Sequence, residues 1–130
     1  MVKPIPDGYH SVTPYLLASD AGKLLDFVKE AFGADEIMRM PGEHGEVSHA
    51  EVRIGDSVVM MGQPGDGSPA TAAALYFYAE DADAMYKRAV AAGAESTEEP
   101  ADQFYGDRRA GVKDPAGNTW WIATHIRDME

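Results

Sequence analysis

Residues 111–125 read GVKDPAGNTWWIATH, and this stretch combines a strong turn signal with a strand signal. The run Asp-Pro-Ala-Gly-Asn, residues 114–118, favours a tight turn at Gly117-Asn118. With residues 109–113 before the turn and 119–124 after it, the pattern predicts a hairpin. Because side chains alternate along a strand, Trp120 and Trp121 must face opposite sides of the sheet. We therefore expect Trp120 in the core and Trp121 on a more open face.

Two amphipathic helices are predicted about 60 residues apart. Residues 20–32, DAGKLLDFVKEAF, begin at a plausible N-cap, Asp20, and stop at Gly33. Residues 81–92 repeat this pattern and stop at Gly93. The apolar positions that form the inner faces of the two helices are Leu24, Leu25, Phe27, Val28, Ala31 and Phe32 in the first, and Ala82, Met85, Tyr86, Ala89 and Val90 in the second.

Strand patterns surround each helix in the same order. The runs SVTPYLLA (11–18) and AALYFYAE (73–80) precede the helices and are rich in branched or aromatic residues. After the first helix, HAEVRIGDSVVMMG (49–62) alternates and turns at Gly55-Asp56, which predicts a hairpin. Each half of the chain therefore predicts a strand, a helix, a strand and a hairpin.

This internal repeat predicts a single α+β domain over residues 1–130. Neither half can bury its sheet face alone, so we expect two modules, residues 10–63 and 73–127, packed side by side. Gly, Pro and Ser cluster in residues 64–72, which we interpret as the linker.

Composition limits the function classes. The formal net charge of −11 disfavours nucleic acid and anionic membrane surfaces as partners, although it tolerates a cationic ligand. The absence of cysteine excludes disulfides, thiolate nucleophiles and Cys-ligated metal sites. No apolar run approaches the ~20 residues of a membrane span, and the N-terminal residues lack a signal-peptide pattern, so a cytoplasmic protein is expected.

Residues 10–126 resemble the glyoxalase / bleomycin-resistance / extradiol-dioxygenase superfamily, also called vicinal oxygen chelate. The resemblance rests on YLLASDAGKLLDFVKEAFGA, HAEVRIGDSVVMM and DQFYGDRRAGVKDPAGNTWWIATH, and it is most similar to the PhnB-like subgroup. It implies two tandem βαβββ modules whose curved sheets form a cup. It also implies a homodimer and a cup that holds a divalent metal or a small-molecule ligand.

The resemblance also identifies four cup-facing positions where metalloenzymes of the superfamily place His, Gln or Glu. These positions are occupied here by Thr13, Val59, Ala74 and Trp121. None supplies an imidazole or carboxylate donor, so the usual metal site is expected to be absent and no cofactor is predicted. An unusual site could instead be built from His10, His44, His49 or His125 with Glu51 or Glu46.

Strand alternation predicts an aromatic lining for the cup in place of a metal. A concavity with several rings and a few polar groups is typical of a small-molecule pocket, although the same rings could fill a dimer interface. The candidate ligand-binding residues are Thr13, Tyr15, His49, Glu51, Tyr76, Tyr78, Phe104, Tyr105, Arg109, Trp121 and His125.

Two features of this set have alternative interpretations. In DQFYGDRR (102–109), Asp107 could form a surface ion pair with Arg108 or Arg109, or the loop could border the cup. His49 and Glu51 could form a base and its orienting carboxylate. Two polar residues on a wet sheet face are more often solvated, and we expect this for the pair.

The sequence therefore favours a binding protein that captures an aromatic or cationic small molecule without metal, as in the drug-sequestering, antibiotic-resistance branch of the superfamily. The alternative is a metal-dependent lyase, isomerase or dioxygenase that polarises vicinal oxygens of its substrate. Whether the protein is an enzyme stays open at this point.

Overall fold

The computed structural model describes residues 2–65 and 69–129. Two βαβββ units follow one another, in agreement with the predicted fold class. The first contains β1 (Tyr15–Leu17), α1 (Ala21–Phe32), β2 (Asp35–Pro41), β3 (Val47–Ile54) and β4 (Ser57–Gly62). The second contains β5 (Ala74–Tyr78), α2 (Ala82–Ala91), β6 (Glu95–Asp102), β7 (Asp107–Lys113) and β8 (Thr119–His125).

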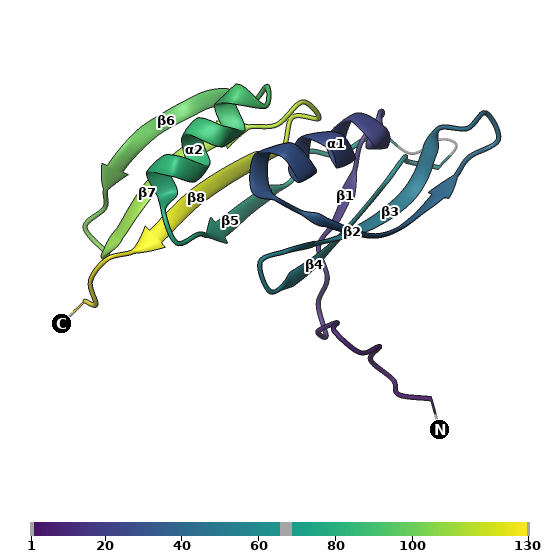
Figure 1. Ribbon diagram of the computed structural model, residues 1–130, viewed down its shortest axis with the longest axis horizontal. Helices are drawn as coiled ribbons and strands as arrows, with labels where there is room; N and C mark the ends of the chain where they lie inside the picture. Colours follow the sequence, from purple (N-terminus) through teal and green to yellow (C-terminus); the bar gives the residue numbers. More distant parts are fainter. Residues whose placement is uncertain (1, 66–68, 130) are drawn as a thin grey trace.

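Each unit forms one mixed four-stranded sheet. The strand orders are β1-β4-β3-β2 and β5-β8-β7-β6, with the first strand parallel to the last strand of its unit. Figure 1 shows the two sheets side by side, with both helices packed over them and the N-terminal segment extending away from the body. The face of each sheet opposite the helices is called the open face below.

The local signals for α1 are confirmed. The Asp20 carboxylate accepts a hydrogen bond from the Lys23 amide at 3.0 Å, and Gly33 ends the helix with a left-handed φ of 67°. The second helix ends at Ala91 with Ala92 as its C-cap in a right-handed conformation, and the positive φ of 113° follows at Gly93. Val90, predicted on the inner face of this helix, is exposed.

One hydrophobic core joins the two units. The Phe32 ring, at the end of α1, lies 4.7 Å from Trp120 on β8 and 5.2 Å from Phe77 on β5, measured between ring centroids. Trp120 is buried, as predicted. Its indole nitrogen donates to Asp114 at 2.8 Å, and the same carboxylate accepts from the Asn118 amide, which fixes the 114–118 turn before β8.

The register of β4 contradicts one predicted orientation. Directly paired residues share a face, and Val59 pairs with Val52, which belongs to the buried core. Val59 therefore faces α1, whereas Val58 and Met60 lie on the open face with Arg53 and Glu51.

Both expected hairpin turns are present, at residues 55–56 and 114–118. The interpretation of residues 64–72 as a linker includes residues 66–68, which lie outside the described part of the chain.

Candidate functional site

Aromatic side chains cover the open face of the second sheet. Tyr76 on β5 pairs with Trp121 on β8, and Tyr78 follows two residues after Tyr76 on the same face. The ring centroids of Tyr76 and Tyr78 are 5.2 Å apart, and those of Tyr76 and Trp121 are 6.5 Å apart. Tyr76 is 39% exposed and Tyr78 is 60% exposed. Trp121 is partly exposed, so these three rings, called the aromatic strip below, are all reached from this face.

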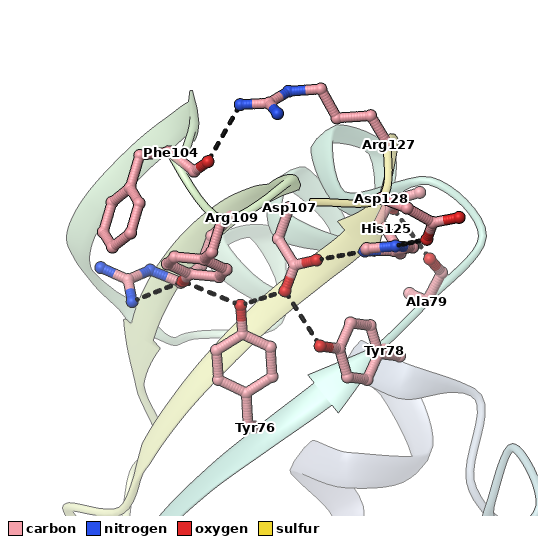
Figure 2. A network of polar contacts seen from close by, with 11 residues as sticks. Tyr76, Tyr78, Ala79, Phe104, Asp107, Arg109, His125, Arg127 and Asp128 are labelled. Carbon is pink, nitrogen blue, oxygen red and sulfur yellow. Dashed lines mark hydrogen bonds and ion pairs between the residues drawn. The ribbon is translucent and has the colours of Figure 1, made fainter. Parts of the chain in front are cut away.

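A buried carboxylate anchors one end of the aromatic strip. Asp107, at the start of β7, is 2% exposed and accepts hydrogen bonds from Tyr76 at 2.7 Å and Tyr78 at 3.0 Å (Figure 2). His125 contacts its other oxygen at 2.8 Å. Burial alone raises the pKa of Asp107, but the donors Tyr76, His125 and Tyr78 outweigh it and hold the pKa below its usual range. Asp107 is therefore an ionised group beneath the tyrosine hydroxyls.

A second carboxylate anchors the other end. Glu98 on β6 accepts from the Trp121 indole nitrogen at 3.0 Å and from the Arg109 guanidinium at 2.8 Å. The Arg109 guanidinium lies 5.8 Å from the Trp121 ring centroid and also donates to the Tyr105 hydroxyl at 3.0 Å. Tyr105 in turn contacts the Tyr76 hydroxyl at 3.1 Å. Hydrogen bonds thus run without interruption from Trp121 to Asp107.

The C-terminal residues close the network on the Asp107 side. His125 lies between Asp107 and Asp128, with its second nitrogen 2.7 Å from the Asp128 carboxylate. Hydrogen bonds to Asp107 and then Asp128 raise the pKa of His125 above 6.5. Arg127 donates to the Phe104 carbonyl at 3.0 Å, and Figure 2 shows Phe104 at the edge of the site with its ring turned outward. Phe104 is 80% exposed.

The open face of the first sheet carries a separate polar cluster. His49 and Glu51 on β3 are 2.9 Å apart between Nε2 and a carboxylate oxygen, and their side chains are only 21% and 13% exposed. The expectation of a solvated pair is therefore wrong. Tyr15 contacts the other His49 nitrogen at 2.9 Å, and Tyr9 donates to Glu51. Tyr15 reaches His49 from β1, and Tyr9 reaches Glu51 from the segment that precedes β1.

Two hollows border the open faces of the sheets. A hollow of about 320 Å³ lies between β1 and β5 and is lined by Tyr15, Ala74 and Tyr76 among others. A second of about 390 Å³ lies beside Thr13, Glu51 and Met60 under the N-terminal segment.

The four positions at which the resemblance implies metal ligands are Thr13, Val59, Ala74 and Trp121, and none carries an imidazole or carboxylate. Trp121 and Ala74 lie on the open face, and their side chains have no lone pair for a cation. In β4 the residues facing the open side are Val58 and Met60 in place of Val59. Within residues 2–65 and 69–129, no group of three or more His, Asp or Glu side chains is arranged to hold a metal ion.

The structure distributes the predicted site residues over both sheets. The connected network of the second sheet contains Tyr76, Tyr78, Trp121, His125, Tyr105 and Arg109. The open face of the first sheet is bordered by Tyr15, His49, Glu51 and Thr13.

Four groups of these clusters are absent from the predicted site residues: the carboxylates of Asp107, Glu98 and Asp128, and the phenol of Tyr9. Asp107 was expected at most in an ion pair with Arg108 or Arg109, but it binds neither. Arg108 instead contacts Asp83 and Asp102. Glu98 and Tyr9 carried no local signal, because their partners are 23 and 42 residues away in the chain.

Comparison with known proteins identifies the family. The Glyoxalase/Bleomycin resistance protein/Dioxygenase superfamily matches residues 9–122. The chain belongs to this superfamily.

Related sequences and structures agree with this membership. An uncharacterised protein of Mycobacterium bovis is 33% identical over 92% of this chain and 86% of its own length, and one of Mycobacterium tuberculosis is equally identical over 76% of its length. TioX from Micromonospora sp. ML1 superposes with a TM-score of 0.79 at 24% identity, over 90% of this chain and 99% of TioX. TnmS3, described as an antibiotic binding protein from Streptomyces sp. CB03234, gives 0.69 at 23% identity over 90% and 99%.

None of the helices formed by the described residues is long and apolar enough to span a membrane.

Proposed function

We propose that this member of the superfamily binds a planar aromatic, cationic small molecule on the aromatic strip, without a metal ion. The observation that carries the proposal is the row of Tyr78, Tyr76 and Trp121 on one exposed face. Rings of this kind offer flat apolar surfaces on which a planar ligand stacks, and their faces attract cations.

The net charge of the chain favours a cation. At the strip itself the carboxylates of Asp107 and Glu98 are paired with His125 and Arg109, so the attraction comes from the whole chain, whose formal net charge is −11. A positive ligand is drawn toward such a surface, and an anionic one is repelled. The description of TnmS3 as an antibiotic binding protein agrees with ligand capture on this fold. Phe104, Tyr105, Arg109 and His125 are the proposed border of the site.

The hydrogen bonds within the strip give it a fixed shape before a ligand arrives. The Tyr76 and Tyr78 hydroxyls share one oxygen of Asp107, and Glu98 holds the Trp121 indole. These hydrogen bonds already hold the side chains in place in the free protein, so binding loses little further side-chain conformational entropy. The proposal includes a homodimer as the working form, which sedimentation analysis tests, and a cytoplasmic location, which cell fractionation tests.

Calorimetric titration with proflavine, a planar cationic acridine, tests the proposal in buffer containing EDTA. The wild-type protein is expected to bind it, and Trp121→Ala is expected to weaken binding about tenfold, because one aromatic contact contributes about 1 kcal/mol or slightly more. The matched control is Tyr86→Phe, since Tyr86 on α2 bonds Ser96 and lies outside the strip.

Two results would contradict the proposal. One is equal proflavine affinity of the wild-type protein and the Trp121→Ala variant. The other is tight, stoichiometric uptake of nickel, zinc or manganese by the purified protein, which would favour the metal-dependent lyase, isomerase or dioxygenase instead.

A further inference from the structure

The cluster on the first sheet has the connectivity of a proton relay. Glu51, His49 and Tyr15 form a chain of carboxylate, imidazole and phenol with both links at 2.9 Å. Tyr9 donates a further hydrogen bond to Glu51. This cluster shares no hydrogen bond with the aromatic strip.

The hydrogen-bond chemistry fixes the direction of the relay. An ionised carboxylate only accepts, so the Nε2 of His49 must carry the proton that it shares with Glu51. Hydrogen bonds from His49 and then Tyr9 lower the pKa of Glu51, which keeps it ionised at neutral pH. A neutral His49 then has an unprotonated Nδ1, and the Tyr15 hydroxyl donates to it.

Tyr15 combines this contact with access from outside. It is 48% exposed and borders the hollow between β1 and β5. On the other side its hydroxyl passes over Gly62, where a Cβ would lie 2.8 Å from the hydroxyl oxygen. The glycine thus leaves the room that the phenol needs to reach His49.

We infer that Glu51, His49 and Tyr15 form a catalytic triad in which Tyr15 is the nucleophile of acyl transfer from small activated carboxylic esters. A nucleophile bonded to a base that a third group orients is the general arrangement for covalent catalysis. Tyr15 and His49 are the catalytic residues, and Glu51 is a positioning residue. This activity is separate from ligand capture on the second sheet.

The reaction balances with water as the second substrate. The Tyr15 oxygen attacks the ester carbonyl carbon while its proton moves to Nδ1 of His49, and the bond to the leaving-group oxygen breaks. The departing oxygen takes its electron pair and then the proton from His49. Water next attacks the tyrosyl ester, gives one proton to His49, and releases the carboxylic acid as Tyr15 regains its proton.

Labelling with phenylmethanesulfonyl fluoride tests whether Tyr15 is activated. The phenol oxygen bonds to sulfur, fluoride leaves, and the stable adduct is located by peptide mass spectrometry. Tyr78 is an internal control, because it is more exposed than Tyr15 but bonds a carboxylate, which raises its pKa. We expect Tyr15 to react faster than Tyr78 in the wild-type protein. Faster labelling of Tyr78 would show that exposure governs reactivity and would overturn the inference.

Release of nitrophenolate from para-nitrophenyl acetate tests the activity itself. Tyr15→Phe is expected to remove the release above the buffer rate, and His49→Gln to slow it about a hundredfold, the lower end of the usual contribution of a general base. Tyr86→Phe is the control and should leave the rate unchanged, because Tyr86 bonds Ser96 and lies outside both clusters. Equal rates for the wild-type protein and Tyr15→Phe would refute the assignment.

The role of Glu51 needs a readout besides rate. Heteronuclear NMR of the imidazole nitrogens reports which nitrogen of His49 carries the proton. The wild-type protein is expected to show the Nε2-protonated form, and Glu51→Gln a mixture of both forms with slower nitrophenolate release. An unchanged proton position in Glu51→Gln would contradict the positioning role.

Discussion

Asp107 shows how a single buried carboxylate holds several strands together. It lies on β7 and accepts hydrogen bonds from two tyrosines on β5 and from His125 on β8. The sequence leaves Asp107 either in a surface ion pair or in a loop that borders the cup, because its acceptor role depends on side chains 18 to 31 residues away.

Asp107→Asn is expected to lower the free energy of unfolding by about 2 kcal/mol, because a hydrogen bond to a charged group contributes about that amount and one amide nitrogen will face a donor. Urea denaturation measures the change. The control is Asp102→Asn, an exposed residue bonded to Arg108, with an expected loss under about 1 kcal/mol. Equal losses in the two variants would show that the buried network is not important for stability.

His125 predicts a pH dependence of the C-terminal residues. Its pKa is raised in the folded protein, so its contribution to stability is complete below the ordinary value near 6.5 and is lost as the pH rises through the folded pKa. Above neutrality, the rates of amide hydrogen exchange at Ile126 and Arg127 are therefore expected to rise with pH more steeply than the intrinsic exchange rate does. His125→Gln should abolish the excess, and its persistence in this variant would assign it to another group.

At the level of secondary structure, the sequence predicts best where signals are local. Asp20 and Gly33 mark the ends of α1 within one turn of the helix, and both are confirmed. The predicted orientation of Val59 is wrong because the residue pairs that flank the two turns lie on opposite faces. Ile54, which pairs with Ser57 across the first turn, belongs to the core, whereas Lys113, which pairs with Thr119 across the second, lies on the open face. An equal count from the turn therefore reaches the core at Val59 and the open face at Trp121.

The loop before β7 provides a prediction about backbone conformation. Gly106 has a φ of 99°, and a Cβ there would lie 2.0 Å from the Arg127 carbonyl oxygen. Its own carbonyl accepts from the amides of Ile126 and Arg127. Gly106→Ala is expected to combine backbone strain of about 1–3 kcal/mol with displacement of the C-terminal segment.

Gly117→Ala is the matched control, since Gly117 has a φ of 91° and nothing within 4 Å of the added Cβ. Carboxypeptidase digestion should accelerate in Gly106→Ala and stay unchanged in Gly117→Ala, while urea denaturation reports the strain in both. Similar digestion rates of the two variants would contradict a role of Gly106 in holding the C-terminal residues.

For the whole molecule, the Phe32 contact predicts that the two units unfold together. Phe32 is buried against Trp120 and Phe77 of the other unit. Phe32→Ala is expected to lower the free energy of unfolding by about 3–5 kcal/mol, the usual loss for a truncated core aromatic. The transition of the wild-type protein should be the same by tryptophan fluorescence and by circular dichroism.

Phe104→Ala removes an equally large ring from an exposed position and should change stability by less than about 0.5 kcal/mol. Two separate transitions in the wild-type protein would indicate that the units are stable independently, against the single core described above.

The indole resonances of the two tryptophans give the most direct measurement of ligand capture on the aromatic strip. Trp121 donates its indole proton to Glu98 at the open face, whereas Trp120 donates to Asp114 in the core, so the two signals report the two sides of one strand. With proflavine added in the presence of EDTA, the Trp121 indole resonance is expected to shift progressively while that of Trp120 stays in place. An unmoved Trp121 resonance at saturating dye, or a shift that requires added divalent metal, would contradict metal-independent binding at the strip.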